Sequence, residues 1–216
     1  MTVLVAGGTG ALGSAVVREL AGSGYEVTVL DRQGEADGAT TVRADLLDPA
    51  ATTEAVAGVD RLEAVVNLVG GFAMGPKVGD SSLEDFEKML RLNLVPAFNL
   101  AHAAMPLLAE GGGGAFVCVG ARAALEPFSG AAGYVTAKSG VITFVKALDA
   151  EYRDAGVRCN AVLPSIIDTP ANREAMPSSD RAGWVAPEQI AQVIRFLISP
   201  DSEVVSGAAV PVYGRG

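Results

Sequence analysis

The chain has 216 residues, of which 50% are hydrophobic and 19% charged, and its formal net charge is −9 with a pI near 4.6. This length and apolar content allow one domain, or at most two, around a sizeable core. The acidic charge disfavours nucleic acid, whose phosphates it would repel, and no uninterrupted apolar run reaches the about 18 residues that a membrane span needs.

Seven apolar, β-branched runs alternate with helical patterns along the chain. They cover residues 2–6, 26–30, 40–44, 63–69, 114–120, 157–164 and 208–213. The longer runs are apolar at nearly every position, as in parallel strands covered on both faces, and the segments between them are long enough for crossover helices. The sequence therefore predicts an α/β fold of the Rossmann type, a doubly wound parallel sheet of about seven strands with helices on both faces.

A helical pattern runs from about Ser81 to Leu108 and contains Pro96 and Pro106. Because proline breaks the helical hydrogen-bond ladder, this stretch is either two helices or one kinked helix. The four glycines at 111–114 indicate a turn before the next strand. No linker or repeat interrupts the pattern, so we expect one domain over 1–216, with a dinucleotide-binding half over about 1–110 and a catalytic and substrate half over about 111–216.

Cys118 and Cys159 each lie inside an apolar β-like run. This setting is typical of buried, reduced thiols rather than of a disulfide framework or a metal site, and we expect no metal. Met1 leads directly into an apolar strand pattern without a charged leader, so we expect a cytoplasmic protein.

Three glycines follow the first predicted strand and open a helix: Gly7, Gly10 and Gly13. In a dinucleotide site such glycines let the backbone approach the pyrophosphate, and the free N–H groups at the helix terminus bind it. A tight strand-to-helix turn without a ligand is the alternative interpretation. The acidic residue at the end of the second strand favours the nucleotide.

Asp31 lies at that position, eighteen residues after Gly13. A carboxylate there accepts hydrogen bonds from both ribose hydroxyls and repels a 2′-phosphate, which favours NAD over NADP. Arg32 beside it offers a guanidinium that a phosphate would attract, so NADP stays open. Asp45, just past the third strand, either accepts from the adenine amino group or is an ordinary loop acid or helix cap.

Tyr134 and Lys138 are four residues apart and share one face if their segment is helical. A nearby ammonium stabilises phenolate and lowers the pKa of a tyrosine, so the pair predicts a proton donor whose lysine also holds the nicotinamide ribose. An exposed tyrosine and lysine on an amphipathic helix is the competing interpretation.

With these motifs together, the chain resembles the short-chain dehydrogenase/reductase family from end to end. The resemblance is carried by Gly7, Gly10 and Gly13, Asp31, Asp45, NLVGG from Asn67, Asn93 in RLNLV, Tyr134 with Lys138, LPSIIDTP from Leu163 and the closing SGAAVPVYG. The family implies an NAD(P)-dependent oxidoreductase with Tyr134, Lys138 and Asn93 as its catalytic residues. Asn93 matches an asparagine that anchors a water relay behind the lysine.

The resemblance also implies where the cofactor is held. Asn67 matches an asparagine that supports the sheet beside the cofactor, and the segment after Pro164 meets the nicotinamide carboxamide through Ile167 and Thr169. The expected cofactor-binding residues are Gly7, Thr9, Gly10, Ala11, Leu12, Gly13, Asp31, Arg32, Asp45, Leu46, Asn67, Gly70, Tyr134, Lys138, Pro164, Ile167 and Thr169.

Two positions depart from the family pattern. Ala121 stands thirteen residues before Tyr134, where the family places a serine that donates to the substrate carbonyl. Losing one such donor costs about 10²- to 10³-fold in rate, so Ser129 or a water is a candidate replacement. In the glycine motif, the family places a glycine at the position of Ala11, and this chain has its glycine one residue earlier, at Gly10.

Within the family the chain is most similar to quinonoid dihydropteridine reductases, which share both departures. The similarity extends over residues 120–138 and 161–188, and Phe72 matches an aromatic residue next to the pterin site. A conjugated diimine accepts hydride in its ring and a proton at nitrogen without a carbonyl oxygen to polarise, so it needs no serine. Asn93 points the other way, because carbonyl-reducing relatives keep this asparagine.

Three functions follow from these residues. The first is NADH-dependent reduction of a quinonoid dihydropterin or similar imine-like heterocycle, with Tyr134 as proton donor and Phe72, Ala121 and Ser129 near the substrate. The second is a ketone or alcohol oxidoreductase in which Ser129 or water replaces the missing serine. The third is an NAD-binding sensor without activity.

Other segments have less specific interpretations. We expect His102 to be a partly buried structural residue. The apolar side chains around Phe98 are core or subunit contacts, and the family implies a homodimer, with a homotetramer as the further option. Residues 171–183, rich in Pro, Ser and charge, form either a substrate lid or an ordinary surface loop.

Overall fold

Seven parallel strands form one sheet at the centre of the computed structural model, which describes residues 1–215. The strands are β1 (Thr2–Ala6), β2 (Glu26–Asp31), β3 (Thr40–Arg43), β4 (Leu62–Asn67), β5 (Gly114–Val119), β6 (Val157–Pro164) and β7 (Ala209–Val212). Their order across the sheet is β3-β2-β1-β4-β5-β6-β7. Successive strands are therefore added on one side of β1 up to β3 and on its other side from β4 onward. The switch point between β1 and β4 is where doubly wound sheets bind their ligands.

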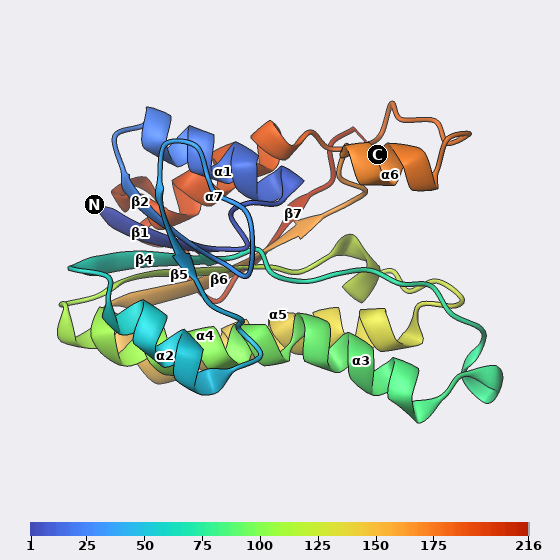
Figure 1. Ribbon diagram of the computed structural model, residues 1–216, viewed down its shortest axis with the longest axis horizontal. Helices are drawn as coiled ribbons and strands as arrows, with labels where there is room; N and C mark the ends of the chain where they lie inside the picture. The colour runs from blue at the N-terminus through green and yellow to red at the C-terminus, as the bar shows by residue number, and fades with distance from the viewer. Residues whose placement is uncertain (216) are drawn as a thin grey trace.

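Helices cover both faces of this sheet (Figure 1). On one face lie α1 (Ala11–Gly22) and α7 (Pro187–Ile198), and on the other lie α2 (Pro49–Ala57), α3 (Leu83–Asn93), α4 (Val95–Glu110) and α5 (Ala132–Tyr152). The short helix α6 (Pro170–Ala175) and the 3₁₀ turns η1 (Val78–Asp80), η2 (Arg122–Ala124), η3 (Arg153–Ala155) and η4 (Pro200–Ser202) complete the elements. The predicted fold class is confirmed.

The strands are apolar throughout because each face of the sheet has its own core. In β1, Leu4 and Ala6 join the cluster under α2, α4 and α5, whereas Val3 and Val5 join the cluster under α1 and α7. Successive strand residues point to opposite faces, so both sets are removed from water. The carboxyl ends of the strands all meet at one end of the sheet, on the right in Figure 1.

The proline-containing stretch is two helices that meet at Leu94. Pro96 lies in the first turn of α4, where a missing N–H is tolerated, and Pro106 lies inside α4. Among the described residues, Leu83–Glu110 has the length and composition of a membrane span, but half of its most apolar window is buried in the fold. It is therefore the pattern of a core helix.

Arg158 of β6 holds the carboxyl end of α7. Its guanidinium donates to the carbonyl oxygens of Leu197 at 2.7 Å and Ser199 at 3.1 Å, and to the hydroxyl of Ser202 at 2.7 Å. The last carbonyls of a helix have no intrahelical partners, so a fixed cation there satisfies them and complements the helix dipole. This contact ties α7 to the sheet.

Both cysteines are buried free thiols, as predicted. Burial raises the pKa of Cys118 and of Cys159 to about 12, so neither is a thiolate at neutral pH. In residues 1–215 no group of three or more His, Cys, Asp and Glu side chains is arranged to hold a metal ion.

Candidate active site

The turn after β1 is shaped for a close approach of backbone. A Cβ added at Gly13 would lie 2.2 Å from the carbonyl oxygen of Gly7 and 2.6 Å from the carbonyl carbon of Gly8, so no side chain fits there. Gly10 is different, because a Cβ there would meet only Gly7 O, at 3.8 Å. The unusual glycine spacing is therefore tolerated: position 10 does not need a glycine, and Ala11 is exposed at the start of α1.

The amino end of α1 fits a pyrophosphate. Gly10 is its N-cap and provides no side-chain hydrogen bond to the first turn, so the N–H groups of that turn remain for an anion. Thr9, Ala11 and Leu12, the other predicted residues of this motif, are next to Gly10 in the chain or one residue further on. The residues present thus fit the diphosphate of a dinucleotide, whose nicotinamide would then reach across the switch point toward β4 and β5.

Asp31 ends β2 beside this turn. Its Oδ2 accepts from the backbone N and the hydroxyl of Thr9, at 3.1 and 2.7 Å, and its Oδ1 accepts from the backbone N of Arg32 at 2.8 Å. Arg32 itself is 3.9 Å from a carboxylate oxygen of Asp45. The acid expected to select the ribose is therefore held in place by the protein.

The loop after β3 forms the adjoining wall. Asp45 accepts from the backbone N of Leu47 at 2.9 Å, and the cap of α2 is Asp48, so the helix-cap interpretation of Asp45 is wrong. Leu46 is buried, and its carbonyl accepts from Nδ2 of Asn99 at 2.7 Å. The sequence analysis did not identify Asn99. An amide side chain within an otherwise apolar helix pattern is a signal, because a buried amide needs a hydrogen-bond partner such as a distant backbone carbonyl.

Tyr134 and Lys138 lie on the first turns of α5, four residues apart as predicted. Lys138 is 6% exposed and donates to the carbonyl oxygen of Val119, at the end of β5, at 2.9 Å. Burial lowers the pKa of Lys138 from 10.5 to about 8. Burial also raises the pKa of Tyr134 to about 12, so the expected lowering of the tyrosine pKa by its lysine is wrong for this structure.

The physical reason lies in where the ammonium is bonded. Its contact in the structure is the Val119 carbonyl, and desolvation alone acts on the phenol. Tyr134 is consequently a protonated phenol throughout the neutral range. Such a group has a proton to give.

Asn93 lies behind the lysine and locks the segment that follows β4. Its Oδ1 accepts from the backbone N of Gly71 at 3.1 Å, and its Nδ2 donates to the carbonyl oxygens of Gly71 and Met89 at 3.0 and 3.1 Å. A Cβ added at Gly70 would lie 2.6 Å from Asn93 Oδ1 and 3.0 Å from Lys138 Nζ. Gly70, Asn93 and Lys138 therefore form one tightly packed unit.

The remaining cofactor candidates lie at the carboxyl ends of their strands. Asn67 ends β4, is 3% exposed and accepts from the backbone N of Val69 at 3.1 Å. Pro164 ends β6, and Thr169 caps α6 by accepting from the backbone N of Asn172 at 3.2 Å. Ile167 forms an isolated parallel bridge with Val185, which anchors this segment beside the sheet.

Aromatic side chains cover the tyrosine. The ring of Phe72 meets that of Tyr134 edge to face at 5.0 Å, and Phe128 lies 6.2 Å from Phe72. Tyr134 lines a cleft of about 470 Å³ that runs past Met74 toward the start of α3. Ala121 is 7% exposed, at the start of η2 after β5. The position that holds the family's serine therefore offers a methyl group.

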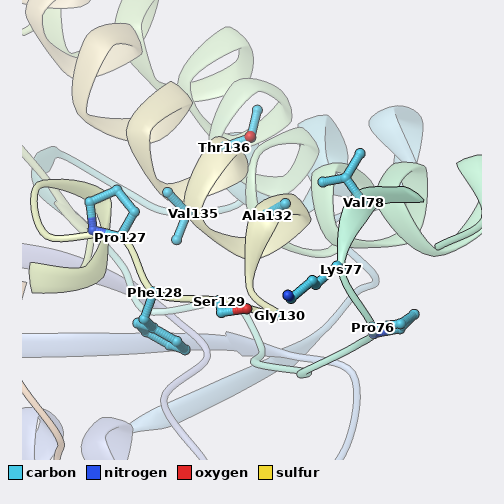
Figure 2. A pocket seen from close by; sticks show the side chains of 10 residues that line it. All are labelled: Pro76, Lys77, Val78, Pro127, Phe128, Ser129, Gly130, Ala132, Val135 and Thr136. Atoms are coloured by element: carbon cyan, nitrogen blue, oxygen red, sulfur yellow. The ribbon is translucent and has the colours of Figure 1, made fainter. Parts of the chain in front are cut away.

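Ser129 lies in a neighbouring pocket of about 340 Å³ rather than beside Tyr134 (Figure 2). It is exposed, and Figure 2 shows its hydroxyl and the ammonium of Lys77 on the same side of that pocket. Tyr134 is not among the lining residues, but this pocket adjoins the cleft of Tyr134, with which it shares Gly130 and Ala132. A replacement of the serine by Ser129 therefore stays a prediction.

Two further expectations concern the periphery. His102 is exposed and stacks on Phe98 with ring centroids 6.0 Å apart, so its partly buried role is wrong. Residues 171–183 comprise most of α6 and an exposed turn. No role was predicted for Tyr213: Arg122, next to Ala121, lies over its ring at 4.8 Å, which joins the segment after β7 to the turn after β5.

Comparison with known proteins agrees with this architecture. A family model described as short chain dehydrogenase matches residues 1–180. The chain is 29% identical to 3-oxoacyl-[acyl-carrier-protein] reductase MabA of Mycobacterium tuberculosis, over 99% of this chain and 91% of the relative. It is 32% identical to cyclohexanol dehydrogenase of an Acinetobacter species, over 88% of this chain and 77% of the relative.

Solved structures share the fold. A short-chain type dehydrogenase/reductase from Mycobacterium ulcerans matches with a TM-score of 0.92 and 24% identity, over 99% of this chain and 88% of that one. A structure described as ElxO with NADP bound matches with a TM-score of 0.91 and 22% identity, over 99% and 97%. The chain therefore belongs to the short-chain dehydrogenase/reductase family and is an NAD(P)-dependent oxidoreductase.

Proposed function

We propose that this oxidoreductase uses NADH to reduce a conjugated, imine-like ring compound, with a quinonoid dihydropterin as the specific candidate. The observation that carries the proposal is the buried methyl group of Ala121 where a carbonyl-polarising hydroxyl is expected. A carbonyl oxygen that gains negative charge needs such a donor. A ring nitrogen that is protonated as hydride arrives needs only one proton source, and Tyr134 supplies it.

Tyr134 is the proposed proton donor. With its pKa raised by burial to about 12, the phenol is protonated at neutral pH and has a proton to give. Lys138 would hold the ribose, and its ammonium carries a positive charge below about pH 8. When bound, the nicotinamide supplies the hydride.

The surroundings suit an uncharged planar ring. Phe72 is 55% exposed and packs edge to face on Tyr134, and Phe128 is 46% exposed and lies beside Phe72. Aromatic faces stack favourably on planar heterocycles and exclude water from them. This arrangement favours a flat aromatic acceptor over a flexible chain.

Asp31 supports NADH as the reductant. Its carboxylate is a fixed anion at the end of β2, where a 2′-phosphate would be repelled. Arg32 leans toward Asp45, with 3.9 Å between the charged groups, rather than standing free for a phosphate. We therefore propose tighter binding of NADH than of NADPH.

A ketone or alcohol oxidoreductase is the second candidate. The names of the relatives favour it, since they include a 3-oxoacyl-[acyl-carrier-protein] reductase and a cyclohexanol dehydrogenase. Asn93, buried and fully bonded, favours it too, because carbonyl-reducing relatives keep an asparagine there. In this reaction Ser129 or a water would have to donate to the carbonyl in place of the missing serine.

One experiment separates the two candidates. The purified protein is assayed with NADH against chemically generated quinonoid dihydropterin and against a panel of ketones. We expect turnover of the dihydropterin and weak turnover of ketones. Tyr134→Phe should lower the rate about 10²- to 10⁴-fold, whereas Tyr152→Phe, at the far end of the same helix, should not. Ketone turnover without dihydropterin turnover would refute the first candidate.

A second variant tests the role of the methyl group. Ala121→Ser restores the family's hydroxyl at a buried position, at the start of η2. Dihydropterin turnover should change less than about threefold, because the reaction develops no charge on a carbonyl oxygen. A gain of about 10²-fold with ketones would show that the missing hydroxyl limits carbonyl reduction at this site, and it would favour the second candidate.

We also propose that two copies associate through α4 and α5. Phe98 is 53% exposed and contacts His102 and Phe144, which forms an aromatic patch across the two helices. An apolar patch of this kind is costly when left in water. Light scattering should report a dimer, or a tetramer built from dimers, and Phe98→Asp should reduce it to a monomer. A monomeric parent protein would refute this proposal.

A further inference from the structure

Thr9 bonds the Asp31 carboxylate twice through one oxygen. Its backbone N and its hydroxyl lie 3.1 and 2.7 Å from Oδ2, and the backbone N of Arg32 lies 2.8 Å from Oδ1. A carboxylate oxygen has two lone pairs. Oδ2 is therefore saturated by Thr9, and Oδ1 keeps one acceptor position.

This bonding limits what Asp31 can offer to a ribose. A free carboxylate would accept from both ribose hydroxyls, one at each oxygen. In this protein only Oδ1 is available without breaking a contact to Thr9. The carboxylate thus presents a single, directed acceptor.

The contact also fixes the position of the charge. Thr9 belongs to the turn after β1, and Asp31 ends β2, so the two hydrogen bonds join the pyrophosphate turn to the ribose site across 22 residues. The hydroxyl has one hydrogen and a second acceptor within reach, the carbonyl oxygen of Gln33 at 3.1 Å, and the shorter distance assigns the hydrogen to Asp31 Oδ2. A charge held in this way cannot swing away from an approaching phosphate.

We propose that Thr9 is the positioning residue for nucleotide discrimination: its hydroxyl fixes the Asp31 carboxylate so that a 2′-hydroxyl is accepted and a 2′-phosphate is repelled. The inference rests on the proposed binding of NADH. It assigns to Thr9 a role through Asp31, not a direct contact with the chemistry. Hydrogen bonds to charged groups are the stronger class, so loss of this one should be measurable.

The test measures binding and needs no turnover. Dissociation constants for NADH and NADPH are determined by fluorescence titration for the parent protein, Thr9→Val and Thr9→Ser. Valine keeps the shape and the backbone N–H but removes the hydroxyl, and serine restores it. The ratio of the NADPH constant to the NADH constant should fall about five- to tenfold in Thr9→Val and stay within about twofold in Thr9→Ser.

A purely structural role would give a different result. If Thr9 only supported the turn, Thr9→Val would weaken the binding of NADH and NADPH equally. The ratio of the two dissociation constants would then stay unchanged, and this result would overturn the proposal. The double variant with Asp31→Asn adds a second criterion. Because Thr9 acts through Asp31, adding Thr9→Val to Asp31→Asn should leave the ratio of the NADPH to the NADH dissociation constant unchanged. Additive effects of the two substitutions on this ratio would overturn the proposal.

Failure of the wider function has its own signature. A parent protein that binds NADPH more tightly than NADH while it still turns over substrate would overturn this inference and the NADH preference but leave the oxidoreductase activity intact. A parent that shows the expected ratio but reduces no dihydropterin would support the role of Thr9 and refute only the substrate.

Discussion

Lys138 is expected to reduce the stability of the fold, and its replacement by methionine measures by how much. The lysine is 6% exposed, and burial lowers its pKa from 10.5 to about 8. Each pKa unit corresponds to about 1.4 kcal/mol, so keeping the ammonium charged inside the protein costs about 3 kcal/mol at pH 7. Methionine removes the charge and keeps most of the volume.

The hydrogen bond to Val119 offsets part of that gain. Its loss leaves a carbonyl oxygen without this donor, at a cost of about 1–2 kcal/mol. Lys138→Met should therefore stabilise the protein by about 1–2 kcal/mol at pH 7, while it removes turnover because the ribose loses the cation proposed to hold it. Urea unfolding provides the free energies.

The effect depends on pH in a defined direction. Because the folded-state pKa is the lower one, the folded protein binds fewer protons than the unfolded chain between about pH 8 and 10.5. The stability of the parent therefore rises with pH through this window, relative to Lys138→Met. The advantage of the variant should shrink by about 2 kcal/mol between pH 7 and pH 10.

A matched control isolates the buried charge. Lys146 lies two turns later on α5 and is exposed, so Lys146→Met should show no comparable change with pH. A Lys138→Met protein that is less stable than the parent at pH 7, or whose difference from the parent stays constant up to pH 10, would refute the reasoning.

Three other substitutions test single contacts. Gly13→Ala adds a Cβ 2.2 Å from Gly7 O, so NADH affinity should fall at least about tenfold in a fluorescence titration; unchanged affinity would contradict the close approach. Gly70→Ala pushes on Lys138 Nζ from 3.0 Å and should lower turnover about 10²-fold, with full turnover as the contrary result. Arg158→Leu leaves the carboxyl end of α7 without its donors and should cost about 2–4 kcal/mol in urea unfolding, a loss below 0.5 kcal/mol being inconsistent with that role.

Several parts of the site were readable from local patterns. The turn around Gly13 and the acid at Asp31 follow from strand and helix signals at fixed spacing, and the pairing of Tyr134 with Lys138 follows from the helical repeat. Such features depend on neighbours within a few residues. For the same reason the break at Leu94 could be anticipated from the prolines around it.

Other parts required contacts between distant segments. Asn99 bonds the carbonyl of Leu46, 53 residues away, and no local pattern encodes that partner. Ser129 is close to Tyr134 along the chain yet lines a different pocket. The ionisation of Tyr134 was predicted in the wrong direction, because it depends on burial and on which carbonyl the lysine contacts.

The sequence by itself determined the layered α/β architecture, the nucleotide turn and the absence of a hydroxyl at position 121, because apolar periodicity, glycine placement and residue identity are properties of the chain. The tertiary structure alone decided how the charges behave. It bonds Asp31 to Thr9, holds Lys138 against Val119 and packs the ring of Phe72 on Tyr134. Desolvation and hydrogen-bond direction depend on atoms brought together from separate strands, so they exist only once the sheet has formed.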